Sequence, residues 1–272
     1  MRVAANGAEL EVILQGSGEP VALVQTALFA EELAPLADDP VLARRYQLIR
    51  YHRRGYAGSS PVPGAGSIER DAADCRALLA SLGIARAHVV GLSFSCAIAL
   101  QLAVEAPGLV HTLALLEPPP LHTPSEREFR AASAAVRADY QDRGPGPAVD
   151  AFLTRIVGPD WRTATADVLP ATEEQLHSDM ATFVEFDMPA LLSWRFGRDG
   201  AARITQPVLY VGGAESGQWF AQVRELMLSW LPHAEDVVLP GAGHSFATTH
   251  PSQLATALAD FLRRHPLPVS RS

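Results

Sequence analysis

The strongest constraint on the fold is a strand, helix, strand pattern between residues 87 and 116. Residues 87–91 and 110–116 are short apolar runs typical of buried strands, and residues 94–105 between them form a helical pattern. Two strands joined by such a helix run parallel, with a right-handed crossover. Similar patterns predict strands at 9–14, 21–25, 46–51, 207–212 and 236–239, and helices at 67–82, 219–230 and 251–264. The chain is therefore predicted to be an α/β protein with a mostly parallel sheet.

This alternation stops between about residue 121 and residue 200. The stretch contains helical patterns, such as residues 126–143 and 149–156, separated by glycine and proline clusters, and it shows no strand pattern. Strand patterns resume at residue 207. We therefore expect a core formed by residues 1–117 and 204–272, with residues 118–203 as a helical insertion.

The composition excludes several classes of protein. Hydrophobic residues make up 48% of the 272 residues and charged residues 19%, which is the balance of a globular chain. The net charge of −8 attracts neither nucleic acid nor an anionic membrane. All 22 basic residues are arginine, which excludes a pyridoxal Schiff base, a lysine nucleophile and a P-loop lysine. A composition rich in arginine and alanine without lysine also favours a GC-rich, actinobacterial genome.

The cysteines and the apolar stretches bear on location. Cys75 and Cys96 lie in predicted helices without metal-ligand spacing, so we expect reduced thiols and no metal site. The first seven residues lack the apolar region of a signal peptide, and residues 89–104 are too few to span a bilayer. We expect a cytoplasmic protein that acts on a small-molecule substrate, without nucleic acid or membrane partners. The sequence does not determine whether the chain forms a homodimer.

A candidate nucleophile stands where the strand at 87–91 meets the next helix. Residues 91–95 read Gly-Leu-Ser-Phe-Ser. Acyl transfer needs a serine on a tight strand-to-helix turn, where the hydroxyl is exposed and the helix N-terminus faces developing negative charge. Ser93 meets this need, and Gly91 lets strand and helix approach closely. Ser95 stands where this type of turn usually has a glycine, and we expect its side chain to crowd the strand and helix slightly. The alternative is that Ser93 only caps the helix, but the flanking strand and helix favour the nucleophile.

The candidate base is His244, in a glycine-rich loop at residues 240–245 before the last helix. From there it can reach the sheet edge that carries Ser93, take the serine proton and return it to the leaving group. Two carboxylates compete as the acid that orients it. Glu215 follows the strand at 207–212, and Glu117 ends the strand at 110–116. The alternatives are a solvated loop for Glu215 and a non-catalytic strand-end carboxylate for Glu117. Glu215 is favoured over Glu117.

Residues 91–95, 212–215 and 240–244 together resemble the α/β-hydrolase superfamily, over nearly the whole chain outside the helical insertion. The resemblance implies an eight-stranded, mostly parallel sheet flanked by helices. It also implies that residues 118–203 form a cap over the active site, inserted after the sixth strand, and that no cofactor is needed. Ser93 argues against the family's dehalogenases and epoxide hydrolases, which need an aspartate at that position.

A weaker element of the resemblance is residues 51–59, which are similar to the family's D-x-R-G-x-G-x-S loop with His52 in place of the aspartate. A structural role on this loop is expected for His52. We expect Arg53 and Arg54 to hold the loop through bonds to carbonyl groups or to Asp71.

The resemblance also implies an oxyanion hole, with a departure. The family usually carries His-Gly after the third strand, where this chain has Gln25, Thr26 and Ala27. By position, the backbone N–H groups of Ala27 and Phe94 would hold the oxyanion. The Thr26 hydroxyl could supply or disturb a hydrogen bond.

The leading hypothesis is a serine hydrolase in which Ser93 attacks a carbonyl carbon, His244 transfers protons, and Glu215 or Glu117 orients His244. The substrate would be an ester, lactone, thioester or C–C bond of a small to medium apolar acyl compound. The altered segment at residues 25–26 motivates an alternative, a cofactor-free lyase, cyclase or oxygenase in secondary metabolism. A third hypothesis is a non-catalytic ligand-binding protein. The first hypothesis predicts that Ser93 reacts with acylating inhibitors. The second predicts that Ser93→Ala keeps its activity, and the third predicts binding without turnover.

Overall fold

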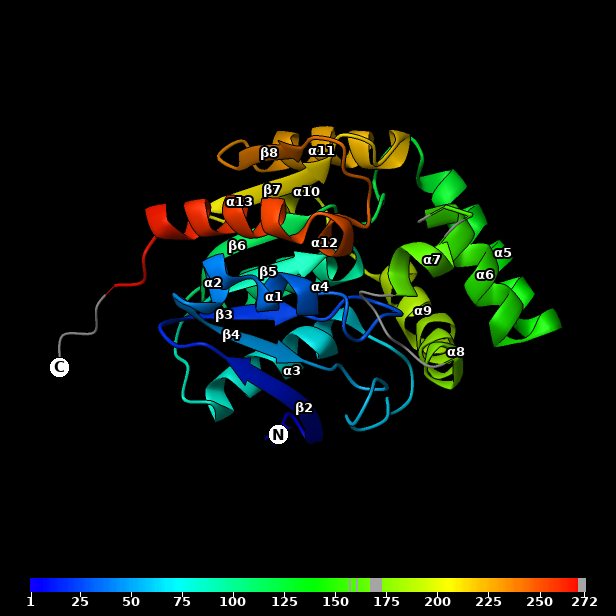
Figure 1. Ribbon diagram of the computed structural model, residues 1–272, viewed down its shortest axis with the longest axis horizontal. Coiled ribbons are helices and arrows are strands. Elements are labelled where there is room, and N and C mark those ends of the chain that lie inside the picture. The colour runs from blue at the N-terminus through cyan, green and yellow to red at the C-terminus, as the bar shows by residue number, and fades with distance from the viewer. Residues whose placement is uncertain (157, 160, 167–172, 269–272) are drawn as a thin grey trace.

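The computed structural model describes residues 1–156, 158–159, 161–166 and 173–268. These residues contain one eight-stranded sheet in the order β1-β2-β4-β3-β5-β6-β7-β8 (Figure 1). The β1–β2 and β2–β4 pairs are antiparallel and the remaining pairs parallel, which confirms the predicted fold class. The strands are β1 (Arg2–Ala5), β2 (Ala8–Gln15), β3 (Glu19–Val24), β4 (Tyr46–Tyr51), β5 (Ala87–Leu92), β6 (Val110–Leu116), β7 (Val208–Gly213) and β8 (Glu235–Leu239).

Strand β1 was not predicted from its own sequence pattern. It has four residues and is largely exposed, so it lacks the apolar run that identifies a strand. It forms a hairpin with β2 through Asn6 and Gly7, whose φ angles are 47° and 73°. Asn-Gly is the pair that a two-residue hairpin turn prefers. The sequence feature that indicates this hairpin is therefore in the turn and not in the strand.

Helices cover both faces of the sheet. One face packs against α3 (Ile68–Ser81), α4 (Phe94–Glu105) and α11 (Gln218–Trp230). The other packs against α1 (Ala34–Asp38), α2 (Pro40–Ala43), α12 (Phe246–Thr249) and α13 (Pro251–Arg264). Successive residues of β5 alternate between the two cores, with Val89 in the first and Val90 in the second. Because both faces are covered, a central strand is apolar throughout rather than alternating.

The chain leaves the sheet after β6 and returns at β7 through a set of helices. They are α5 (Glu126–Arg143), α6 (Pro145–Ile156), α7 (Trp161–Ala166), α8 (Glu173–Thr182), the π-helix η1 (Phe183–Asp187), α9 (Met188–Ser193) and α10 (Arg198–Ala201). Among the described residues from 118 to 203 there is no strand, and residues 157, 160 and 167–172 of the predicted cap lie outside the described part. Figure 1 shows α5–α9 gathered beyond the strand ends to which the β3 and β4 arrows point.

Other expectations concern membranes and thiols. No helix in the described part of the chain combines the length and the apolar character that crossing a bilayer requires. Cys75 and Cys96 are free and buried. Burial raises the pKa of the Cys75 thiol to about 12, so that thiol stays protonated and inert.

Candidate active site

Ser93 lies on the sharp turn between β5 and α4. Its backbone has φ 49° and ψ −116°, in the left-handed half of conformational space that residues with a side chain avoid. The side chain makes no capping hydrogen bond to α4. The geometry therefore does not support the alternative that Ser93 only caps the helix.

The residues on either side explain how strand and helix approach so closely. A Cβ atom on Gly91 would lie 2.7 Å from the carbonyl oxygen of Ser95 and 2.9 Å from Cα of Cys96, so only glycine fits. Ser95 is fully buried, and its hydroxyl accepts from the Leu92 N–H at 2.9 Å and donates to the Val24 carbonyl at 2.7 Å. Serine in place of the family's glycine thus links the turn to β3.

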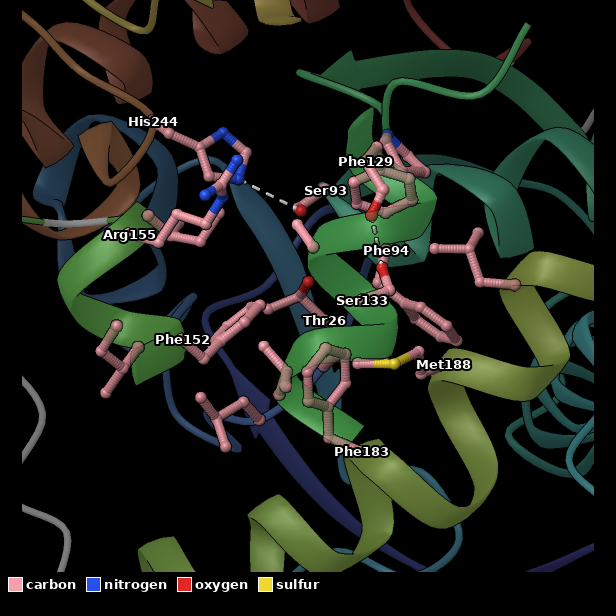
Figure 2. Close-up of a pocket in the computed structure, with 18 of the residues that line it drawn as sticks. Thr26, Ser93, Phe94, Phe129, Ser133, Phe152, Arg155, Phe183, Met188 and His244 are labelled. Carbon is pink, nitrogen blue, oxygen red and sulfur yellow. Dashed lines mark hydrogen bonds between the residues drawn. The ribbon is translucent and has the colours of Figure 1, made fainter. Parts of the chain in front are cut away.

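A chain of hydrogen bonds connects Ser93 to a buried carboxylate. His244 Nε2 is 3.2 Å from Ser93 Oγ, a contact drawn in Figure 2, and His244 Nδ1 is 2.7 Å from Glu117 Oε2. The other oxygen of Glu117 accepts from the Gly213 N–H at 2.7 Å. Phe220, which sequence analysis did not single out, stacks on the imidazole with ring centroids 3.9 Å apart. The imidazole is therefore held on three sides.

The structure places Glu117, and not the favoured Glu215, against His244. Glu215 is exposed on the loop after β7, and its described hydrogen bond is from its backbone N–H to the Ala242 carbonyl. Glu117 has φ 47° at the end of β6, and its side chain is 1% exposed and fixed by the Gly213 N–H. β6 and β7 are neighbours in the sheet, so chain order alone could not separate the two carboxylates.

The two predicted oxyanion donors lie beside Ser93. Ala27 and Phe94 line the same pocket as Ser93. Neither backbone N–H donates a hydrogen bond to any other group in the described part of the chain. Figure 2 places the Thr26 side chain near the centre of this pocket. Two N–H groups are thus available to an oxygen of a bound molecule.

The pocket lies between the sheet core and the helices of the insertion, and most of its wall is apolar. Figure 2 shows Ser93 and His244 toward one end, with Phe183 and Met188 toward the other. The wall includes Leu28, Phe29, Phe129, Val136, Phe152, Leu153, Leu191, Trp219 and Phe220. Arg155 at the wall bonds Glu128 at 3.0 Å and lies over the Trp219 ring, so its charge is already paired.

Glu32 is a further titratable group in this pocket, and sequence analysis missed it. Its side chain is half-buried in the pocket wall. Burial raises the pKa of Glu32 to about 7, against the opposing effect of a charge on His244. A carboxyl group in an apolar wall is costly to ionise, so this side chain changes charge near neutral pH.

The model of the alpha/beta hydrolase fold family matches residues 12–251. The chain belongs to this family. The predicted resemblance is thereby confirmed, and so is the prediction of a hydrolase enzyme of this fold at the level of the family. The candidate carbamate hydrolase RutD of Pseudomonas syringae pv. syringae is 28% identical over 238 residues, covering 85% of this chain and 89% of RutD.

Solved structures share the alpha/beta hydrolase fold. A thermophilic esterase from Thermogutta terrifontis superimposes with a TM-score of 0.83 at 21% identity, covering 98% of this chain and 99% of the esterase. The enol-lactonase from Burkholderia xenovorans LB400 gives a TM-score of 0.81 at 23% identity, covering 97% of this chain and 100% of the lactonase. The fold is therefore shared from end to end.

Proposed function

We propose that this alpha/beta hydrolase is a serine hydrolase with the triad Ser93, His244 and Glu117. The observation that carries the proposal is the unbroken series of contacts from Glu117 through His244 to Ser93, at 2.7 and 3.2 Å. It ends in a pocket where two backbone N–H groups have no hydrogen-bond partner among the described residues. This is the arrangement that acyl transfer requires.

Each group has a distinct step. Glu117 accepts from Nδ1–H of His244, which leaves Nε2 free to take the Ser93 proton while Oγ bonds to the substrate's carbonyl carbon. The N–H groups of Ala27 and Phe94 stabilise the oxyanion. His244 then protonates the leaving group as its bond to carbon breaks. Water attacks the acyl group on Ser93, gives a proton to His244, and Ser93 recovers its proton as the acid product leaves.

The substrate class follows from the wall of the pocket. An apolar wall with few polar side chains suits a small to medium apolar acyl compound. The esterase, enol-lactonase and candidate carbamate hydrolase among the similar proteins support a carbonyl substrate. We propose an ester, lactone or thioester, and retain a C–C bond of a diketone. Residues 118–203 are proposed to act as the cap, no cofactor is proposed, and the cytoplasm is the proposed location.

The lyase, cyclase or oxygenase alternative was motivated by the altered segment at residues 25–26. That segment still places Ala27 in the pocket with Ser93, and its N–H has no hydrogen-bond partner in the part of the chain that the structure describes, which suits hydrolysis. We therefore favour hydrolysis over that alternative and over the ligand-binding protein.

The proposal is tested by labelling with a fluorophosphonate and measuring intact mass for the wild type, Ser93→Ala and His244→Ala. One adduct on the wild type and none on either variant is expected. A folded wild type that takes up neither this probe nor a smaller one would overturn the proposal. Short p-nitrophenyl esters, lactones and carbamates would then be compared as substrates for the labelled enzyme.

A further inference from the structure

A network of buried polar side chains joins the helical insertion to the core. Arg53 and Tyr56 lie on the loop after β4, and Asp187 ends the π-helix η1 of the insertion. Their exposed fractions are 3%, 0% and 4%. Arg53 donates to the two oxygens of Asp187 at 2.9 and 2.6 Å, and the Tyr56 hydroxyl donates to Asp187 at 2.6 Å. One carboxylate of the insertion thus accepts hydrogen bonds from two core residues.

The same two core residues also hold the segment that carries Ala27. Arg53 donates from Nε to the Gln25 carbonyl at 3.0 Å and from Nη2 to the Thr26 carbonyl at 3.2 Å. The Tyr56 hydroxyl accepts from the Leu28 N–H at 3.1 Å. The peptide groups before and after Ala27 are therefore both anchored to this network.

The direction of the Ala27 N–H follows from peptide geometry. The Thr26 carbonyl and the Ala27 N–H belong to one planar trans peptide, so they point in opposite directions. Arg53 holds the carbonyl oxygen on its own side. The N–H is thereby turned away from Arg53, and Ala27 lines the pocket.

We propose that Arg53, Tyr56 and Asp187 are positioning residues that aim the Ala27 N–H at the oxyanion, so that the helical insertion is a structural part of the oxyanion hole. This inference rests on the proposed serine hydrolase function. We call these three residues the oxyanion brace.

The backbone of the segment needs such a brace. Leu28 has φ 69°, a left-handed conformation that a branched residue rarely adopts and that surrounding contacts must maintain. Burial lowers the pKa of Arg53, but the charges of Asp187 and Asp71 outweigh it and keep the pKa above its ordinary value. Burial and Asp187 raise the pKa of Tyr56. Both side chains therefore remain protonated donors at physiological pH.

A neighbouring ion pair provides a matched control. Arg54 donates to Asp74 at 2.6 and 3.0 Å, and both residues are buried. The contacts of this pair are within the core: Arg54 also donates to the Asn6 carbonyl at 2.7 Å, and Asp74 also accepts from the Asn6 side-chain amide at 2.7 Å. Asp74→Asn thus removes the charge from a similar buried pair without touching residues 25–28.

The test compares Asp187→Asn and Tyr56→Phe with Asp74→Asn and the wild type. Each enzyme is assayed on a p-nitrophenyl ester and on the matched thionoester, in which sulfur replaces the carbonyl oxygen. Oxyanion donors stabilise oxygen better than sulfur, so a misaligned donor reduces the preference for the oxygen ester. For both brace variants we expect kcat on the oxygen ester to fall about tenfold or more, with KM nearly unchanged, and the oxygen-over-sulfur preference to shrink.

General destabilisation would slow both substrates equally, so the preference ratio separates positioning from folding. Asp74→Asn should keep the wild-type ratio. An unchanged ratio in both brace variants would overturn the brace. If Asp187→Asn fails to fold, Tyr56→Phe, which loses a single hydroxyl, decides alone. A wild type that hydrolyses neither ester would overturn the proposed function, and the brace with it.

Discussion

Three residues at the candidate site have backbones that side chains disfavour. Leu28, Ser93 and Glu117 have φ angles of 69°, 49° and 47°. Leu28 follows the proposed oxyanion donor, Ser93 is the proposed nucleophile and Glu117 is the proposed acid. Strained residues of this kind persist where the surrounding structure fixes them, and they concentrate at functional sites. Specific hydrogen bonds hold two of these residues: the Leu28 N–H donates to the Tyr56 hydroxyl, and the Gly213 N–H donates to the Glu117 carboxylate.

The identity of the acid is tested by one pair of substitutions. Glu117→Gln should lower kcat by roughly a hundredfold to ten-thousandfold, because the amide no longer holds His244 in the tautomer that accepts the serine proton. Glu215→Gln should keep the wild-type rate, since that side chain is exposed. Steady-state kinetics on a short ester check both. The reverse pattern would restore Glu215 as the acid.

Glu32 should make stability depend on pH. Its pKa is raised from 4.5 to about 7 by burial, so the folded chain holds a proton that the unfolded chain releases between those values. Stability contributed by the protonated form is therefore lost as pH rises through this window. The difference in Tm between Glu32→Gln and the wild type should therefore increase from pH 4.5 to pH 7 and stay constant above pH 7.

The control is Glu225→Gln, which removes the same charge from an exposed position. Thermal unfolding of the three proteins across this pH range gives the comparison. A Tm difference for Glu32→Gln that is flat with pH would show that Glu32 ionises freely in the folded chain.

At the scale of elements, the sequence predicted what periodicity and turn chemistry encode. The buried strand β5, the helix α4 and the glycine-rich loop of His244 all have strong local patterns, so Ser93 and His244 could be singled out as candidates that the structure brings together. The sequence could not tell which carboxylate contacts His244, because Glu117 and Glu215 follow adjacent parallel strands and only tertiary contacts decide between them. The brace was equally hidden, since Arg53 and Asp187 are 134 residues apart. The expected bond from Arg53 to Asp71 is present at 2.9 Å.

The contact between β5 and α4 can be tested with a single methyl group. Gly91→Ala would place a Cβ against the Ser95 carbonyl at 2.7 Å, so strand and helix must separate. We expect a loss of about 1–3 kcal/mol in the free energy of unfolding, as for overpacked cores. Gly108→Ala is the control, because a Cβ there meets nothing within 4 Å. Urea unfolding measures both, and equal stability of the two variants would contradict the close approach.

At the scale of the molecule, the pocket is built by both parts of the chain. A shared apolar cluster joins Leu28 and Phe29 of the core to Val149, Leu153 and Phe183 of the insertion. At the wall, Glu128 of α5 accepts from Trp219 of α11 at 3.1 Å. Core and insertion therefore contribute side chains to one pocket, with the proposed reacting groups on the core.

This division predicts which residues set substrate length. Met188 of the insertion is 4% exposed and lines the pocket toward the end away from Ser93 (Figure 2). Met188→Trp should shorten the space for an acyl chain. Loss of contact with about two methylene groups would raise KM for a hexanoate ester by about tenfold. The acetate ester, whose acyl group is four carbons shorter, is the internal control and should keep its KM. An unchanged chain-length profile would place the acyl group elsewhere.

The position of Glu117 has a consequence for protein engineering and for evolutionary drift. In the proposed triad the acid follows β6, so the side chains at positions 214 and 215 take no part in proton transfer. The backbone there is nonetheless fixed by hydrogen bonds. The N–H groups of Ala214 and Glu215 donate to the Leu239 and Ala242 carbonyls, respectively. A fixed backbone with exposed, unengaged side chains is what a grafting site requires. A conjugation handle or recognition motif introduced at these two positions should leave turnover intact, and natural homologues should be free to diverge there.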